Sequence, residues 1–305
     1  MRTSLLTLLA AAALGLTTGP VVAAAGAGAA GAAAPTYYVN LGDSYAVGYQ
    51  PGLGATPGYA GYVAAHTGLI LANFGCGGAT TTSILNTVGC PDVLPHTAGA
   101  MTYPTTTQIA AAQAFITAHE GHIGLITVSI GGNDVTGCAA NPNPISCIGT
   151  VVHDIETNVS TLAADLRAAA GPSVPIVGTT YPDVILGGYV YPTDPPAAST
   201  VSLVKLSVVA FKSLINPSLA KAYASSSGSL VDVTKASGSY VPLTRTVHTA
   251  TYGTIPVATA SVCALTWFCA AHGNIHAKTS GYDLIGKLIV ARYRAVEPAR
   301  GSASG

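Results

Sequence analysis

The chain has 305 residues with 12 basic and 12 acidic side chains, so its formal net charge is zero and only 8% of its residues are charged. A nucleic-acid binder held by phosphate contacts needs a clustered surplus of Lys and Arg, so this composition excludes that class, together with disorder of the highly charged kind. Because 49% of the residues are hydrophobic, the chain can bury a large core, and its length suits one large domain or two small ones.

The first segment in chain order is an apolar run after a single positive charge. Arg2 precedes the run at residues 5–16, and an Ala/Gly tract follows with small-residue cleavage positions. This layout is typical of a secretory signal peptide, and the run is shorter than the roughly 20 residues of a membrane span. We therefore expect a signal peptide at residues 1–25, cleavage between residues 23 and 34, and a secreted, extracellular protein.

Strand and helix patterns then alternate along the chain. Short β-branched or apolar runs that end in turn residues predict five strands, at residues 36–41, 69–74, 123–130, 175–180 and 230–233. Apolar side chains at helical spacing predict helices at residues 58–66, 105–120, 148–170, 199–225 and 280–294. Thr105 and Gln108 are spaced as a capping box, and Pro217 predicts a kink.

This alternation predicts an α/β fold, a three-layer α/β/α sandwich with a mostly parallel five-stranded sheet. We expect a single domain over residues 35–296 and a flexible tail at residues 297–305. Lys205 and Lys287 interrupt the later apolar runs, so we expect no stable membrane insertion.

The six cysteines occur as three close pairs, which allow 15 disulfide connectivities. Pairing of neighbours is favoured because it closes three small, independent loops: Cys76–Cys90, Cys138–Cys147 and Cys263–Cys269. Zinc binding is the alternative, but the sequence has no C-x-x-C and its eight histidines are scattered. We therefore expect no metal, and disulfides agree with export.

Residues that follow strands are the candidate functional residues, because ligands bind beyond the carboxyl ends of parallel strands. Ser44 follows the first strand in Gly42-Asp43-Ser44, where its hydroxyl could act as a nucleophile or where an ordinary turn could cap a helix. A glycine cluster at residues 75–78 follows the second strand. Its N–H groups could approach a ligand closely, or the cluster could be a turn shaped by a disulfide.

Two further segments complete the set. Asn133 follows the third strand and could donate its amide to an oxyanion or satisfy a local turn, while Asp134 beside it has a structural interpretation. His276 precedes the last helix, where it could reach the first turn or simply be solvated. Tyrosines 181, 189 and 191 flank a loop that could line an acyl or sugar pocket or could pack as ordinary loop residues.

In this order, from residue 42 to residue 282, the four segments resemble the SGNH, or GDSL-type, hydrolase family. The resemblance is closest to secreted actinobacterial esterases and lipases, whose three local disulfides and Leu-Thr-Trp-x-Cys segment are similar to residues 265–269 here. It implies a flavodoxin-like fold with Ser44 as nucleophile and His276 as general base. The N–H groups of Ser44 and Gly78 and the side-chain amide of Asn133 would form the oxyanion hole.

The sequence departs from the family pattern beside the histidine. Many members have Asp three residues before it and Pro directly after it, where this chain has Gly273 and Ala277. Asn274 could contact the ring, but a backbone carbonyl from residues 267–272 is the favoured orienting group. We therefore expect a Ser44–His276 dyad in which Asn274→Ala leaves most activity.

The resemblance implies a carboxylic-ester hydrolase that works through an acyl-serine intermediate without a metal or cofactor. Lipid or short-chain acyl esters suit the apolar loops, and an acetylesterase acting on polysaccharide or cell-wall glycan is the alternative within the enzyme class. A secreted binding protein on a hydrolase scaffold is the non-enzymatic alternative. The expected partner is a small-molecule or lipid ester and no nucleic acid, and the expected state is a monomer.

Overall fold

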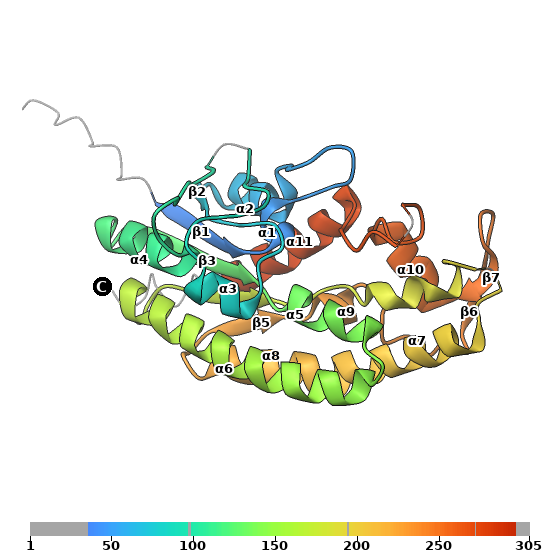
Figure 1. Cartoon of the computed structure of the whole chain (residues 1–305). Coiled ribbons are helices and arrows are strands. Elements are labelled where there is room, and N and C mark those ends of the chain that lie inside the picture. Colours follow the sequence, from blue (N-terminus) through green and yellow to red (C-terminus); the bar gives the residue numbers. More distant parts are fainter. Residues whose placement is uncertain (1–35, 97–98, 194, 272, 297–305) are drawn as a thin grey trace, which may run out of the picture. The chain divides into compact units, whose positions relative to one another are not determined.

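Five parallel strands form one sheet in the order β2-β1-β3-β4-β5. The structure is a computed structural model that describes residues 36–96, 99–193, 195–271 and 273–296 (Figure 1). Its parallel strands are β1 (Tyr37–Gly42), β2 (Ile70–Asn73), β3 (Ile123–Ser129), β4 (Ile176–Thr179) and β5 (Ser229–Val231). The expected signal peptide at residues 1–25 and the expected tail at residues 297–305 lie outside the described residues.

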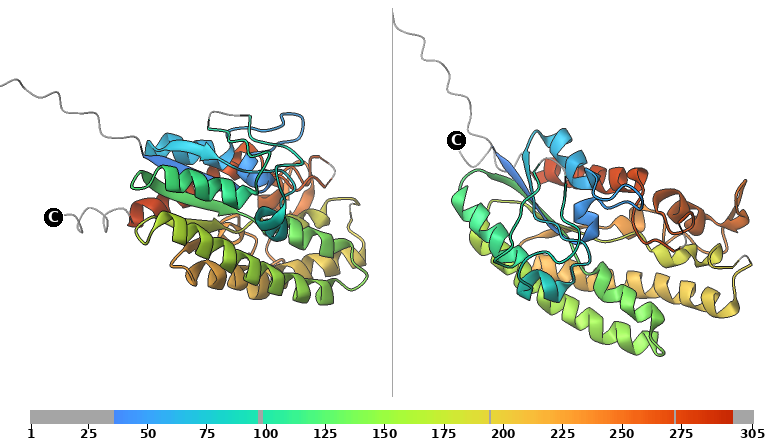
Figure 2. Two further views of the ribbon diagram at one scale, coloured as in Figure 1. Left: turned by 60° about the vertical axis from the view of Figure 1, so that its left-hand side comes forward. Right: turned by 45° about the horizontal axis from the view of Figure 1, so that its top comes forward.

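Helices cover both faces of the sheet, as Figure 2 shows from two directions. One face carries α4 (Gln108–Ala118), α6 (Pro144–Ala170) and α8 (Asn216–Ala224), and the other carries α1 (Ser44–Val47), α2 (Gly58–Thr67) and α11 (Thr279–Val296). Alternate residues of β1 enter the two cores: Val39 and Leu41 pack on one side and Tyr38 on the other. The predicted α/β fold with helices on both faces of a parallel sheet is confirmed.

The helix predicted at residues 199–225 runs from Ala198 to Ala224 and contains a π-helical turn. It consists of α7 (Ala198–Ala210), the turn η3 (Phe211–Ile215) and α8. Pro217 has no N–H to donate and its ring would crowd the carbonyl of residue 213, which lies within the wider turn η3. The kink at Pro217 stays a prediction.

By length and composition this long helix could cross a membrane, contrary to the expectation that Lys205 cuts the apolar run too short. In the structure, 28% of its most apolar 18-residue window is buried, and α8 packs against α6 and the sheet. A single such helix is weak evidence for a membrane span, because core helices of water-soluble proteins pass the same test.

Several short elements were not expected from the sequence, and most of them lie in loops at the carboxyl ends of the strands. They are α3 (Thr81–Asn86), α5 (Gly132–Thr136), η1 (Gly137–Ala140), η2 (Val184–Tyr189), α9 (Val233–Ala236), the antiparallel hairpin β6 (Thr246–Thr249) and β7 (Gly253–Pro256), and α10 (Val257–Leu265). The hairpin lies beside α10 (Figure 1). All of them except the nine-residue α10 have only four to six residues, too few to show a periodic pattern in the sequence.

The expected capping box at Thr105 and Gln108 is wrong. Helix α4 begins one turn later than expected, and its N-cap is Thr107, whose side chain accepts a hydrogen bond from the N–H of Ala110. Gln108 is instead buried and directed at the sheet. A reciprocal capping box does occur at the start of α3, between Thr80 and Ser83.

Three disulfides join neighbouring cysteines: Cys76–Cys90, Cys138–Cys147 and Cys263–Cys269. Each closes a loop that follows a strand or precedes α11. The cross-links therefore hold individual loops at one edge of the sheet and do not tie distant parts of the core together.

Candidate active site

Ser44 is the first residue of α1, directly after the turn that ends β1. The backbone at Gly42 has φ of 133°, and a Cβ there would lie 2.0 Å from the carbonyl oxygen of Ser129 on β3, so only glycine fits this close approach. Asp43 caps α1 by accepting a hydrogen bond from the N–H of Tyr45 at 2.9 Å. The turn is thus fixed against β3 on one side and by its own helix cap on the other.

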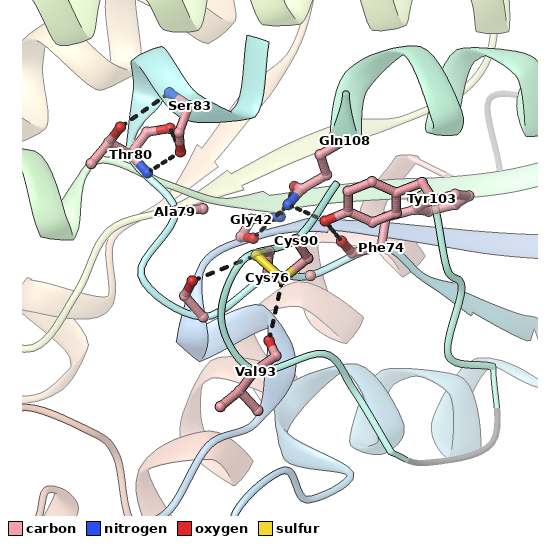
Figure 3. The surroundings of a disulfide bond; sticks show 12 residues. Gly42, Phe74, Cys76, Ala79, Thr80, Ser83, Cys90, Val93, Tyr103 and Gln108 are labelled. Carbon is pink, nitrogen blue, oxygen red and sulfur yellow. Dashed lines mark hydrogen bonds between the residues drawn. A yellow bond between two sulfur atoms is a disulfide. The ribbon is translucent and has the colours of Figure 1, made fainter. Parts of the chain in front are cut away.

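Side-chain amides hold this turn from three directions. Gln108 of α4 brackets Gly42: its Oε1 accepts from the Gly42 N–H at 2.7 Å, and its Nε2 donates to the Gly42 carbonyl at 3.1 Å (Figure 3). Behind α1, Asn40 and Asn73 both donate to the carbonyl of Ala46, at 3.1 and 2.9 Å. All three amides are buried, so their hydrogen bonds fix where Ser44 points.

His276 lies against Ser44. Its Nε2 is 2.9 Å from the Oγ of Ser44, and its Nδ1 is 2.9 Å from the side-chain oxygen of Asn274. Because the Asn oxygen only accepts, Nδ1 carries the proton and Nε2 presents its lone pair to the serine hydroxyl. This is the arrangement that a general base next to a nucleophile requires.

The contact to Asn274 differs from the expectation that a backbone carbonyl of residues 267–272 orients the ring. The described part of that loop, residues 267–271, instead donates the N–H of Trp267 to the carbonyl of His276 at 2.9 Å. The Asn274 oxygen also accepts from the His276 N–H at 3.1 Å, so one side chain fixes both backbone and ring. A short Asn-x-His spacing is the sequence signal for this contact.

Gly78, Asn133, Ser44 and His276 line one groove, which contains about 650 Å³ of empty space, part of it open to solvent. Gly78 has a left-handed backbone with φ of 70°. Asn133, on α5, donates its amide to the carbonyl of Ala79 at 2.8 Å, and an amide has a second N–H to offer. The three expected oxyanion donors therefore border the same space as the Ser44 hydroxyl.

Asp134, next to Asn133, has the structural position expected from the sequence. Its carboxylate accepts hydrogen bonds from the N–H and the hydroxyl of Thr81 at the start of α3. It therefore links α5 to α3, while the neighbouring amide faces the groove.

Burial controls the titration of the site. It lowers the pKa of His276 to about 4, and the negative charge of Asp92 opposes this shift only in part. The imidazole is therefore neutral, as a base must be, at ordinary pH. Burial also raises the pKa of Asp43 to about 7, opposed by hydrogen bonds from Tyr181 (2.6 Å) and the Tyr45 N–H.

A second, apolar cavity opens on the other side of Ser44, with about 620 Å³ of empty space, part of it open to solvent. Its apolar lining comes from α5, η2, the π-helical turn and α8: Val135, Val184, Ile185, Phe211, Ile215 and Leu219. Ser44, Asn133 and Ile275 border both this cavity and the groove. A substrate bonded at Ser44 would thus have an apolar space on one side and a polar one on the other.

The three tyrosines flanking the loop after β4 have different surroundings. Tyr181 lines the apolar cavity, whereas Tyr189 packs against the small cluster of Leu186 and Val204. The ring of Tyr191 lies edge-on to Phe268 at 6.1 Å between centroids. Among the described residues, no group of three or more His, Cys, Asp or Glu side chains is arranged to hold a metal ion.

The model of the GDSL-like lipase/acylhydrolase family matches residues 41–206, more than half of the chain. The chain therefore belongs to this family. Membership, together with the parallel sheet, assigns it to the hydrolases that act on esters. The match covers Ser44, Gly78 and Asn133 and ends before Asn274 and His276. No curated protein matches the chain.

Proposed function

We propose that this protein is a secreted carboxylic-ester hydrolase, of the esterase or lipase type, that works through an acyl-serine intermediate. The observation that carries the proposal is the contact of 2.9 Å between Ser44 Oγ and His276 Nε2, with Nδ1 held by Asn274. The proposal includes the closer resemblance to secreted actinobacterial esterases and lipases. It also includes a signal peptide at residues 1–25 and a single catalytic domain at residues 35–296.

In the proposed reaction, Ser44 Oγ attacks the ester carbonyl carbon while His276 Nε2 takes the hydroxyl proton. The negative charge on the former carbonyl oxygen is stabilised by the N–H groups of Ser44 and Gly78 and by the amide of Asn133. Collapse of the tetrahedral intermediate expels the alcohol, which takes the proton from His276. Water, activated by the same histidine, then hydrolyses the acyl-serine.

Asn274 has a larger part in this proposal than the sequence suggested. By accepting the Nδ1 proton, it selects the tautomer whose Nε2 lone pair faces Ser44. The site is then a Ser-His-Asn arrangement in which an amide takes the place of the usual carboxylate. An amide orients the ring without adding the charge that would raise the pKa of the histidine.

The apolar cavity supports an acyl group longer than acetyl as the substrate's acid part. Its lining is almost wholly apolar, and burying each methylene is worth about 0.8 kcal/mol. An acetyl group would leave most of this surface unused, which favours lipid or short-chain acyl esters over an acetylated glycan.

Labelling with a fluorescent serine-directed phosphonate tests the proposal. We expect wild-type protein to be labelled and to hydrolyse nitrophenyl esters, with both properties lost in Ser44→Ala and His276→Ala. Wild-type protein that is folded by circular dichroism yet unlabelled and inactive on every chain length from two to sixteen carbons would support a binding protein instead. Sequencing the N-terminus of protein recovered from the medium tests export and cleavage between residues 23 and 34.

A further inference from the structure

The groove beside Ser44 carries one formally charged side chain that the proposed reaction does not use. Among its lining residues, all of which the structure describes, Asp92 alone bears a charge, because burial keeps His276 neutral. The Asp92 side chain is exposed, so solvent and substrate can reach it. Its Oδ2 lies near the glycine turn: a Cβ placed on Gly77 or Gly78 would be 3.0 or 3.3 Å from it.

The Cys76–Cys90 disulfide holds Asp92 at this position. It joins the glycine turn to the segment that precedes Asp92 by two residues. On the other side of Asp92, the carbonyl of Val93 accepts the N–H of Gly77 at 2.7 Å. Figure 3 shows Val93 beside the two sulfurs. A covalent link and a backbone hydrogen bond thus flank the carboxylate, which restricts its movement away from the groove.

The direction of the reaction assigns this groove to the alcohol part of the substrate. The general acid must stand beside the leaving oxygen to protonate it, so the alcohol leaves on the side of His276. That side is the groove, lined by His276, Asn274, Tyr49 and Asp92, whereas the apolar cavity lies on the side of η2 and α8.

A carboxylate at this place has a cost for catalysis. It lies beside Gly78, whose N–H is one of the proposed oxyanion donors, and like charges repel across a short distance. A positive charge on the substrate would offset this repulsion by neutralising Asp92. The half-buried ring of Tyr49 packs edge-on to His276 at 4.6 Å and borders the same groove. It offers a positive charge on the substrate a second contact, a cation–π interaction.

We propose that Asp92 and Tyr49 form a subsite for an ammonium group on the alcohol part of the ester, so that the protein prefers esters of amino alcohols. This inference rests on the proposed function and names the substrate class of the same site. The acyl group occupies the apolar cavity, and the ammonium group lies in the groove against Asp92.

The test compares three esters of one acyl chain, butyrate, under identical conditions: butyrylcholine, its uncharged carbon isostere 3,3-dimethylbutyl butyrate, and glyceryl monobutyrate. The measured quantity is the ratio of kcat/KM for the choline ester to that for the isostere. Both esters use the same Ser44 and His276, so any effect of a substitution on the histidine cancels in this ratio.

We expect a ratio of roughly two to five in wild-type protein at low salt, the range for an exposed ion pair, and a smaller ratio at 0.5 M salt. In Asp92→Asn the ratio falls to about one. Removing the carboxylate should also raise kcat/KM for the uncharged isostere, because the repulsion of the oxyanion is gone. The two esters therefore respond in opposite directions.

Asp165→Asn is the matched control, because it removes the same charge near the end of α6 that leads into β4. This position lies toward the amino ends of the strands, and Asp165 does not line the groove. Its ratio should equal that of the wild type. An equal ratio in wild type and Asp92→Asn, with the isostere hydrolysed, would overturn the subsite and leave the esterase proposal standing. If Asp92→Asn lowers kcat/KM for the glyceryl ester alone, the groove binds a polyol and the ammonium subsite is overturned. Absence of hydrolysis of all three esters, with no phosphonate labelling, would overturn both proposals.

Discussion

The proposed chemistry depends on Asn274, an amide in the place of the carboxylate that usually orients a catalytic histidine. Its oxygen holds the Nδ1 proton of His276, and it carries no charge to stabilise an imidazolium. Since burial lowers the pKa of His276 to about 4, the neutral base persists to unusually low pH. We expect kcat/KM of the wild type to stay on its plateau down to about pH 5 and to fall through an acidic limb near pH 4.

Two substitutions of Asn274 separate orientation from charge. Asn274→Ala removes the hydrogen bond and should lower kcat/KM roughly tenfold at pH 7, the value of one well-placed hydrogen bond. Asn274→Asp keeps an acceptor and adds a negative charge, so the pKa of His276 rises and the acidic limb moves to higher pH. The measurement is kcat/KM for a nitrophenyl ester from pH 3.5 to 8. Unchanged limbs in the Asp variant would rule out the contact with Nδ1.

Asn133 offers a second test at the scale of one side chain. Removing one oxyanion donor costs about 10² to 10³ in rate, whereas losing the hydrogen bond to Ala79 costs only about 1 kcal/mol of stability. We expect Asn133→Ala to lower kcat by that factor while shifting Tm by only a few degrees. Full turnover in this variant would show that the amide does not contact the oxyanion.

The junction of β1 and α1 is the element whose geometry is most restricted by backbone packing. A Cβ on Gly42 would lie 2.0 Å from the carbonyl oxygen of Ser129, with φ of 133°. Gly52 also has a positive φ, 78°, but nothing lies within 4 Å of its Cβ position. Comparing substitutions at Gly42 and Gly52 therefore distinguishes the effect of a steric clash from that of backbone strain alone.

We expect Gly42→Ala to destabilise the fold by roughly 3 kcal/mol or more and Gly52→Ala by about 1 to 2 kcal/mol. Urea unfolding followed by circular dichroism measures both, and a failure of Gly42→Ala to express as folded protein agrees with the expectation. Equal midpoints for the two variants would contradict the close approach of β1 to β3.

Elements with a strong repeating pattern could be predicted from the sequence, whereas those fixed by tertiary contacts could not. The five parallel strands are short, bounded apolar runs, so their existence followed from composition and turn residues. The N-cap of α4 could not be predicted, because the choice between Thr105 and Thr107 depends on the contact of Gln108 with Gly42, 66 residues away. The spacing of apolar side chains at a period of 3.6 likewise could not predict the π-helical turn before Pro217.

The same division holds within the candidate site. Ser44 and His276 could be singled out because each stands in a recognisable segment just after a strand or before the last helix. The Asn-x-His spacing indicated Asn274 as one candidate to orient the ring, but the sequence favoured a backbone carbonyl. The choice depends on the turn that brings two residues of one loop face to face. Asp92 stands in no recognisable motif, and its place in the groove depends on the Cys76–Cys90 disulfide and on the hydrogen bond between Gly77 and Val93.

At the scale of the whole molecule, the buried carboxyl groups of Asp43 and Asp183, both among the described residues, make the free energy of unfolding depend on pH. Burial raises the pKa of Asp43 and that of Asp183 to about 7, so the folded state retains protons that the unfolded state loses near pH 4. Folded protein therefore loses stability as the pH rises from about 4 to 7. His276 acts oppositely: its lowered pKa adds stability as the pH rises from about 4 to 6.5.

Asp183→Asn isolates one of these contributions. The Asn side chain keeps an oxygen for the N–H of Ile185, and residue 183 lines neither the groove nor the apolar cavity beside Ser44. We expect the difference in Tm between variant and wild type to grow in favour of the variant as the pH rises from 4.5 to 8, because the contributions of Asp43 and His276 cancel in the difference. Calorimetry at five pH values measures it, and parallel curves would mean that Asp183 titrates like an exposed carboxyl group.

The three disulfides have a consequence for how the chain reaches its folded state. The bonded cysteines are separated by only 14, 9 and 6 residues, and each native partner is the nearest cysteine along the chain. Loop closure is least costly between near neighbours, so random encounters in the unfolded chain already favour native pairs. Oxidation therefore needs no preformed sheet, and the strands remain free to pair in any order after the cross-links have formed.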